Sequence, residues 1–266
     1  GFDLRLDANT DNLTLYFDET VDVSTFNPAK FTLHSLAVGG TSFSLTGGTV
    51  LTPNAPVVVI ELSVDDRNGI KVLNDLATGA NSTFLAMQLG AFLDMALAPN
   101  PATATDLGVS TYGPDFEAPQ LVSFVANVNA GTLTLNFNEP VRVSTLDTTG
   151  LTLQAAPSAA ASLEYRLTGG GSGSANGLSL VLNMSLDDLN AVKFNEGLYV
   201  SRATSWLRAD STAIADMAGN ALAAIATGDA LQAVLFVNDT TRPHVLSFDL
   251  DMTAETLTLH FLEIMD

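Results

Sequence analysis

One segment recurs three times along the chain at an almost constant spacing. It reads NLTLYFDETVDVSTF around Phe17, TLTLNFNEPVRVSTL around Phe137 and TLTLHFLEIMD around Phe261, so the three anchor phenylalanines lie 120 and 124 residues apart. Self-similarity at a fixed period indicates tandem structural units. This period is too long for a solenoid repeat and has the size of a whole domain. The 266-residue chain is therefore expected to be an array of domains.

A second pair of matching segments predicts the domain boundaries. The stretch DFEAPQLVSF begins at Asp115 and DTTRPHVLSF begins at Asp239. We expect a first repeat over 1–114 that lacks its opening linker segment, a second over 115–238, and the opening hairpin of a third over 239–266. A lone hairpin is marginally stable in water. The chain is thus expected to be a window on a longer array; the alternative is that the hairpin completes a sheet of a neighbouring molecule.

Within each repeat the apolar residues alternate with polar ones. Leu13, Leu15 and Phe17 share one face of the first recurrent segment, a period of two that is typical of a half-buried antiparallel strand. The stretch VVVIELSV predicts a second strand that carries Val58 and Val64 on its inward face.

Each repeat also has one helical candidate, SVDDRNGIKVLNDL in the first and SLDDLNAVKFNEGL in the second. In the second, Ser185 is placed to cap the helix start, with aspartates in the first turn. The predicted fold is all-β: tandem immunoglobulin-like β-sandwich repeats, each with one short helix.

Composition excludes several classes of function. The net charge is −19, which opposes binding to nucleic acid and to anionic membrane surfaces. Cysteine is absent, so disulfides and thiolate metal sites are ruled out. No apolar run reaches 18 residues, so no membrane span is expected. Histidine is scarce and the chain has no nucleophile elbow, zinc-helix motif or phosphate loop, so we do not expect an enzyme, and no cofactor is required.

The motif set resembles a known family. An opening Asp-x-x-x-Pro, the strand LTLxFxExVxxSTL and a late DMAGNAL are together similar to bacterial immunoglobulin-like domains of the S-layer type. Similar arrays occur in large algal and protist cell-surface proteins and in mastigoneme-like filament proteins. The first repeat departs from the pattern, with LDMALAPN in place of DMAGNAL. The resemblance implies an extracellular or cell-surface location and a structural role.

Four Asn-x-Ser/Thr sequons mark candidate glycosylation sites: Asn12, Asn81, Asn183 and Asn238. None has proline in the middle position, and an attached glycan needs an outward-facing asparagine. The alternative is chance, because a chain rich in threonine and asparagine produces sequons freely.

Acidic residues recur at matching positions and are candidate calcium ligands. They are Glu19, Glu139, Asp94, Asp216, Asp115 and Asp239, and the last two open the junctions. Ca²⁺ takes several carboxylate and carbonyl oxygens, so recurrence at a junction suggests a calcium site. The alternative is that these side chains cap turns and helix starts.

The leading hypothesis is a structural protein of an extracellular filament, appendage or cell-surface coat. Its main partner is expected to be itself, through contacts at Val59, Val181, Pro119 and Pro243. The second hypothesis is an adhesin stalk or a module that binds glycans or another surface. The third is a spacer stiffened by calcium.

Overall fold

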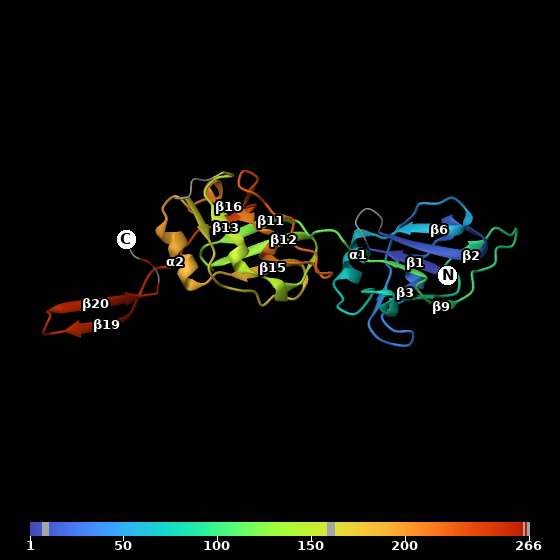
Figure 1. The fold of residues 1–266 in the computed structure, drawn as a ribbon, viewed down its shortest axis with the longest axis horizontal. Helices are drawn as coiled ribbons and strands as arrows, with labels where there is room; N and C mark the ends of the chain where they lie inside the picture. Colours follow the sequence, from blue (N-terminus) through green and yellow to red (C-terminus); the bar gives the residue numbers. More distant parts are fainter. Residues whose placement is uncertain (7–10, 159–162, 263, 265–266) are drawn as a thin grey trace. The chain divides into compact units, whose positions relative to one another are not determined.

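The computed structural model describes residues 1–6, 11–158, 163–262 and 264. Contacts divide the chain into two compact units. The first contains Gly1–Glu117 with Met217–Asn220, and the second contains Ala118–Asp216 with Ala221–Asp266. Strands predominate in both, so the predicted all-β class is confirmed (Figure 1).

The first unit has two sheets. One has the strand order β10-β1-β2-β6-β5, with β8 also paired to β2, and the other has the order β4-β3-β7-β9. Their bounds are β1 Phe2–Arg5, β2 Asn12–Asp22, β3 Phe31–His34, β4 Ser42–Ser44, β5 Thr49–Val50, β6 Ala55–Glu61, β7 Phe84–Met87, β8 Leu93–Asp94, β9 Thr105–Gly108 and β10 Thr111–Gly113.

The second unit repeats this arrangement, except that β5 and β8 have no counterpart among its described strands. Its sheets have the orders β15-β12-β11-β18 and β14-β13-β16-β17. The bounds are β11 Leu121–Asn127, β12 Thr132–Val141, β13 Leu151–Gln154, β14 Glu164–Arg166, β15 Gly177–Asn183, β16 Trp206–Ala209, β17 Leu231–Gln232 and β18 Leu235–Val237. In both units the strand that opens the repeat pairs in parallel with the strand that closes it, β1 with β10 and β11 with β18.

The two sheets of each unit enclose one apolar core. Leu13 and Leu15 of β2 are buried, as the alternation predicts, and so are their counterparts Leu133 and Leu135 of β12. The core of the first unit also contains Phe31 and Leu33 of β3, and that of the second contains Leu151 and Leu153 of β13. Each core therefore takes side chains from both sheets, which is sandwich packing.

The two α-helices of the described residues are α1, Val64–Lys71, and α2, Leu186–Phe194. Ser185 caps α2 as expected, because its hydroxyl accepts a hydrogen bond from the Asp188 N–H at 3.1 Å. Ser63 caps α1 in the same way. The inward placement of Val64 was wrong: β6 ends at Glu61 and Val64 begins the helix, where it is 57% exposed. Neither helix is long and apolar enough to cross a membrane.

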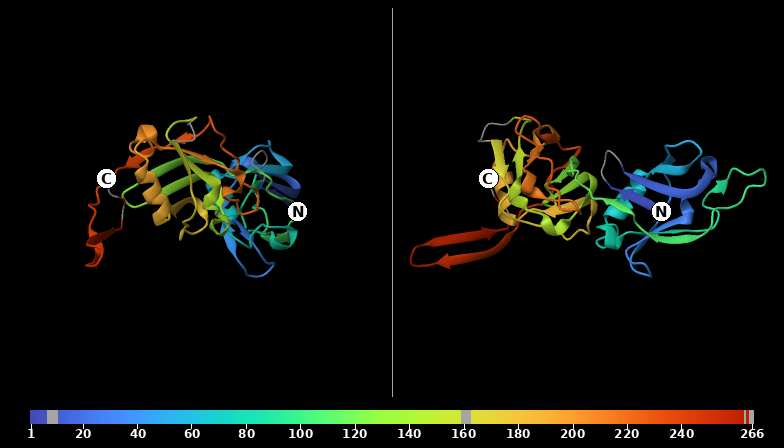
Figure 2. Two further views of the ribbon diagram at one scale, coloured as in Figure 1. Left: turned by 60° about the vertical axis from the view of Figure 1, so that its left-hand side comes forward. Right: turned by 45° about the vertical axis from the view of Figure 1, so that its right-hand side comes forward.

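A hairpin of two antiparallel strands, β19 (Val245–Asp251) and β20 (Thr256–Phe261), follows; it is drawn in red in Figures 1 and 2. Its register matches that of the preceding repeat, since Phe248 pairs with Leu259 as Phe124 pairs with Leu135. Phe248 is nevertheless 63% exposed, whereas Phe124 is fully buried. The hairpin therefore exposes to solvent apolar residues whose counterparts in β11 and β12 are buried in the core.

Candidate functional site

A fully buried aspartate lies in the first turn of each helix. In the first unit both carboxylate oxygens of Asp66 accept hydrogen bonds from the Thr46 N–H, at 3.0 Å, and further bonds come from the Thr46 hydroxyl and the Gly47 N–H. In the second unit Asp188 accepts the same set from Thr168 and Gly169. The carboxylate therefore ties the helix start to the loop that follows β4 in the first unit and β14 in the second.

Asp188 has one further donor, the Tyr165 hydroxyl at 2.9 Å. Burial by itself raises the pKa of Asp188, but the hydrogen bonds from Thr168, Tyr165 and Ser185 outweigh it and leave the pKa lowered. The side chain is therefore held as a carboxylate whose acceptor positions are used within the unit. This geometry supports a structural task for the second aspartate of each Asp-Asp pair.

The junction aspartates form ion pairs with lysines in the last turns of the two helices. Lys71 Nζ lies 2.7 Å from an Asp115 carboxylate oxygen, and the two side chains are only 6% and 7% exposed. Lys193 Nζ lies 2.5 Å from Asp239, with exposures of 14% and 26%. The pair thus recurs with the repeat and fastens each junction segment to the last turn of the helix before it.

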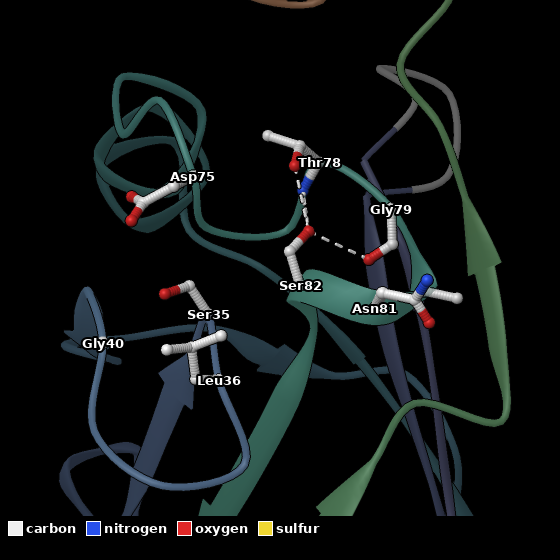
Figure 3. Close-up of a pocket in the computed structure, with 9 residues that line it drawn as sticks. Ser35, Leu36, Gly40, Asp75, Thr78, Gly79, Asn81 and Ser82 are labelled. Carbon is white, nitrogen blue, oxygen red and sulfur yellow. Dashed lines mark hydrogen bonds between the residues drawn. The ribbon is translucent and has the colours of Figure 1, made fainter.

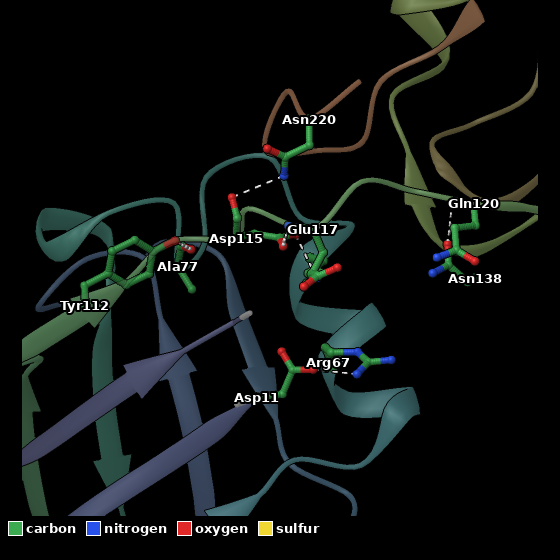
Figure 4. A network of polar contacts seen from close by, with 10 residues as sticks. Asp11, Arg67, Ala77, Tyr112, Asp115, Glu117, Gln120, Asn138 and Asn220 are labelled. Atoms are coloured by element: carbon green, nitrogen blue, oxygen red, sulfur yellow. Dashed lines mark hydrogen bonds and ion pairs between the residues drawn. The ribbon is translucent and has the colours of Figure 1, made fainter. Parts of the chain in front are cut away.

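The surroundings of these pairs differ in detail. Burial raises the pKa of Asp239. Its interactions with Lys193 and the Thr241 N–H lower that pKa by a larger amount, so the net shift is downward. Near Asp115, which also accepts the Glu117 N–H, the Tyr112 hydroxyl donates to the Ala77 carbonyl at 2.6 Å (Figure 4). Burial, with a smaller contribution from Asp115, raises the pKa of Tyr112 to about 12.

The remaining candidate calcium ligands fall into two pairs. In the first unit Glu19 is exposed, and Asp94 accepts hydrogen bonds from the Ala96 and Asn100 N–H groups and from the Asn100 side chain. In the second unit Glu139 and Asp216 are both buried, and their carboxylate oxygens lie within 4.8 Å of each other.

The partners of these carboxylates bear on the calcium hypothesis. Lysines already balance the charges of Asp115 and Asp239, and a turn already uses the oxygens of Asp94. Ca²⁺ usually takes six to eight oxygen ligands, more than two carboxylates supply. Calcium binding stays a hypothesis from the sequence, which a chelation experiment can test.

Three of the four sequon asparagines, Asn81, Asn183 and Asn238, are exposed, and Asn12 is half-buried within β2. Asn81 lies at the rim of an open pocket of about 500 Å³ between two loops of the first unit (Figure 3). Across this pocket from Asn81 lie Ser35 and Asp75. Three sequons are thus placed where a bulky group can be attached.

The proposed assembly positions differ in accessibility. Val181 of β15 is 40% exposed and lies opposite Thr134, and Val59 of β6 is half-buried opposite Thr14. Pro243 is exposed. Pro119 is buried, and its carbonyl accepts the Ala223 N–H at 2.9 Å, so its role lies inside the second unit.

No protein-family model matches the chain, and neither the curated proteins nor the solved structures contain a significant match. The interpretation of the function therefore depends on the internal repetition of the sequence and of the structure. Sequence reasoning missed the lysine–aspartate pairs, although the signal was present: Lys71 and Lys193 recur at matching positions, as do Asp115 and Asp239.

Proposed function

We propose that the chain is a structural repeat segment of an extracellular filament, appendage or cell-surface coat, built from immunoglobulin-like repeats. One observation carries the proposal: the two units share the order of their eight matching strands and the same polar anchors. The buried aspartate at the helix start and the lysine–aspartate pair at the helix end both occur twice. The polar groups of the units thus recur as fold-stabilising contacts, which is what a mechanical repeat requires.

The outward surfaces fit the same proposal. The exposed side of the β12–β15 pair carries Thr134, Asn136 and Val181, which are short or β-branched side chains on a pleated surface. A β-sheet surface of this kind can pack against a copy of itself with little loss of side-chain entropy.

Electron microscopy of the native material tests the proposal. Regular filaments or sheets with an axial repeat commensurate with one or two units are expected. Isolated particles with no periodic order would refute it and would favour the adhesin hypothesis. Peptide mapping after glycosidase treatment would show in parallel whether Asn81, Asn183 and Asn238 carry glycans.

A variant pair tests the lateral contact. Val181→Asp is expected to abolish assembly, because it places a charge on a surface that self-packing would desolvate. Val181→Thr keeps the β-branched shape and the β propensity, and it is expected to assemble normally. Normal assembly of Val181→Asp would exclude this surface as the contact.

A further inference from the structure

The first and last strands of each sandwich pair with one another in parallel. In the second unit these strands are β11 and β18. At one end of the pair the Val234 N–H donates to the Phe124 carbonyl at 2.9 Å, and at the other end the Val128 N–H donates to the Val237 carbonyl at 3.0 Å. In the first unit β1 and β10 pair in the same way. The two strands through which the chain enters and leaves a unit are therefore held directly to each other.

This pairing decides how tension along the chain acts on the second unit. The chain enters the sandwich at the start of β11 and leaves it at the end of β18, and further residues lie on both sides. Because the two strands run in parallel, tension pulls them from opposite ends and tends to slide one past the other. The hydrogen bonds of a parallel ladder are evenly spaced, so they share the load in this direction. A pull at the same end of both strands would instead open the bonds one at a time.

The segment before β11 is fastened to the same unit. The Pro119 carbonyl accepts the Ala223 N–H at 2.9 Å, and the Gln120 carbonyl accepts the Asn138 N–H at 3.1 Å. The Gln120 N–H donates in turn to the Asn138 side chain at 2.7 Å (Figure 4). Leu121, the first residue of β11, is only 6% exposed and belongs to the core. Tension from the preceding residues therefore meets these contacts before it reaches the strand pair.

The segment after β18 is fastened as well. Lys193 of α2 forms its ion pair with Asp239, which lies just beyond the end of β18. The Asn129 side chain, in the turn that follows β11, accepts the Thr240 N–H at 2.8 Å and the Thr241 hydroxyl at 3.0 Å. The lysine–aspartate pair of the first unit has the matching place after β10. Tension from the following residues therefore also meets polar contacts before it reaches the strands.

We propose that each unit resists extension of the chain, and that the parallel pair of its first and last strands is the element that carries the tension. The contacts of the flanking segments transmit the load to this pair, and the unit stays folded until the two strands slide apart. The source of the tension in the native material rests on the structural function proposed above. The resistance itself belongs to the single unit and can be measured without filaments.

The test is single-molecule force spectroscopy on the full chain, with the force applied in two directions. The chain has no cysteine, so two introduced cysteines are its only attachment points. Gln120→Cys with Asn238→Cys pulls β11 and β18 from opposite ends, and Ala130→Cys with Asn238→Cys pulls them from the same end. All three positions are exposed, so both variants are expected to keep the core intact. The unfolding force should be at least about twofold higher for the opposite-end pair, because its hydrogen bonds share the load.

Equilibrium stability serves as the control for this comparison. Forced unfolding reports the rate of unfolding along the direction of the pull, whereas the free energy of unfolding has no direction. The two cysteine variants should therefore give the same free energy of unfolding in a urea titration while they differ in unfolding force.

One backbone hydrogen bond tests whether the resistance comes from this strand pair. Val234→Pro removes the N–H that binds the Phe124 carbonyl, at a position that is 54% exposed, and Val234→Ala keeps the N–H as the matched control. Val234→Pro should lower the opposite-end force relative to Val234→Ala. It should leave the same-end force unchanged, because this bond lies at the far end of the pair and opens last.

Equal unfolding forces in the two directions would overturn the proposal, and so would a lower force for the opposite-end pair. An equal fall of both forces in Val234→Pro would also overturn it, because a general loss of stability would then explain the effect. Regular filaments together with equal forces would leave the structural function standing without the resistance. Isolated particles together with a higher opposite-end force would refute the filament and support the resistance of the unit.

Discussion

Replacement of Asp188 by alanine should destabilise the second unit far more than replacement of its neighbour Asp187. Asp188 is fully buried and accepts from four donors, namely the Thr168 N–H and hydroxyl, the Gly169 N–H and the Tyr165 hydroxyl. A hydrogen bond contributes a net amount of about 1 kcal/mol, and more when the acceptor is charged. Thr168 is itself exposed, so water can replace part of the loss. We expect a cost of about 3 kcal/mol.

The chain contains its own reporter for this measurement. Trp206 is the only tryptophan and lies in β16 of the same unit. Its fluorescence in a urea titration gives the free energy of unfolding for each variant. Asp187→Ala is the matched control, because Asp187 is exposed in the same first helical turn and loses a similar interaction with the helix dipole. Asp188→Asn keeps one acceptor oxygen and should cost about 2 kcal/mol.

Acid provides a second readout with a definite sign. The pKa of Asp188 is lowered in the folded protein, so its stabilising effect is complete above the unfolded pKa of about 3.9 and is lost as pH falls through the lower folded value. The difference in stability between the wild-type protein and Asp188→Ala should therefore narrow below about pH 4. If the free energies of unfolding of Asp188→Ala and Asp187→Ala differ by less than about 0.5 kcal/mol at neutral pH, the anchoring role of Asp188 is refuted.

Three further results are expected. Phe124→Ala should cost about 3–5 kcal/mol by urea titration, while Phe248→Ala at the matching hairpin position should cost almost nothing, because only Phe124 is buried; equal costs would contradict the exposed hairpin. By calorimetry, Lys71→Ala should lower the free energy of unfolding by about 3 kcal/mol, because it leaves the Asp115 charge buried without its lysine. The double variant Lys71→Met with Asp115→Asn should recover most of this loss. A double variant as unstable as the single one would argue against the ion pair. Chelation should leave the melting temperature unchanged, because lysines already balance Asp115 and Asp239, and a fall of several degrees would instead establish a calcium site.

The sequence predicted the strands well because a period of two is a local signal. The burial of Leu13, Leu15, Leu133 and Leu135 follows directly from alternation. Helix starts were equally local, since Ser185 and the aspartates after it lie next to one another. The error at Val64 arose where one local pattern gave way to another, because the alternation of β6 was continued past the cap residue into the helix.

The ion pairs could not be derived from any single repeat. Lys71 and Asp115 are far apart in the sequence, and only the packing of the junction segment against the end of α1 brings them together. A comparison of the two copies would have singled out both residues, since Lys193 and Asp239 recur in the same places. Recurrence alone would therefore have marked these residues as important to the fold, whereas their contact with one another comes only from the structure.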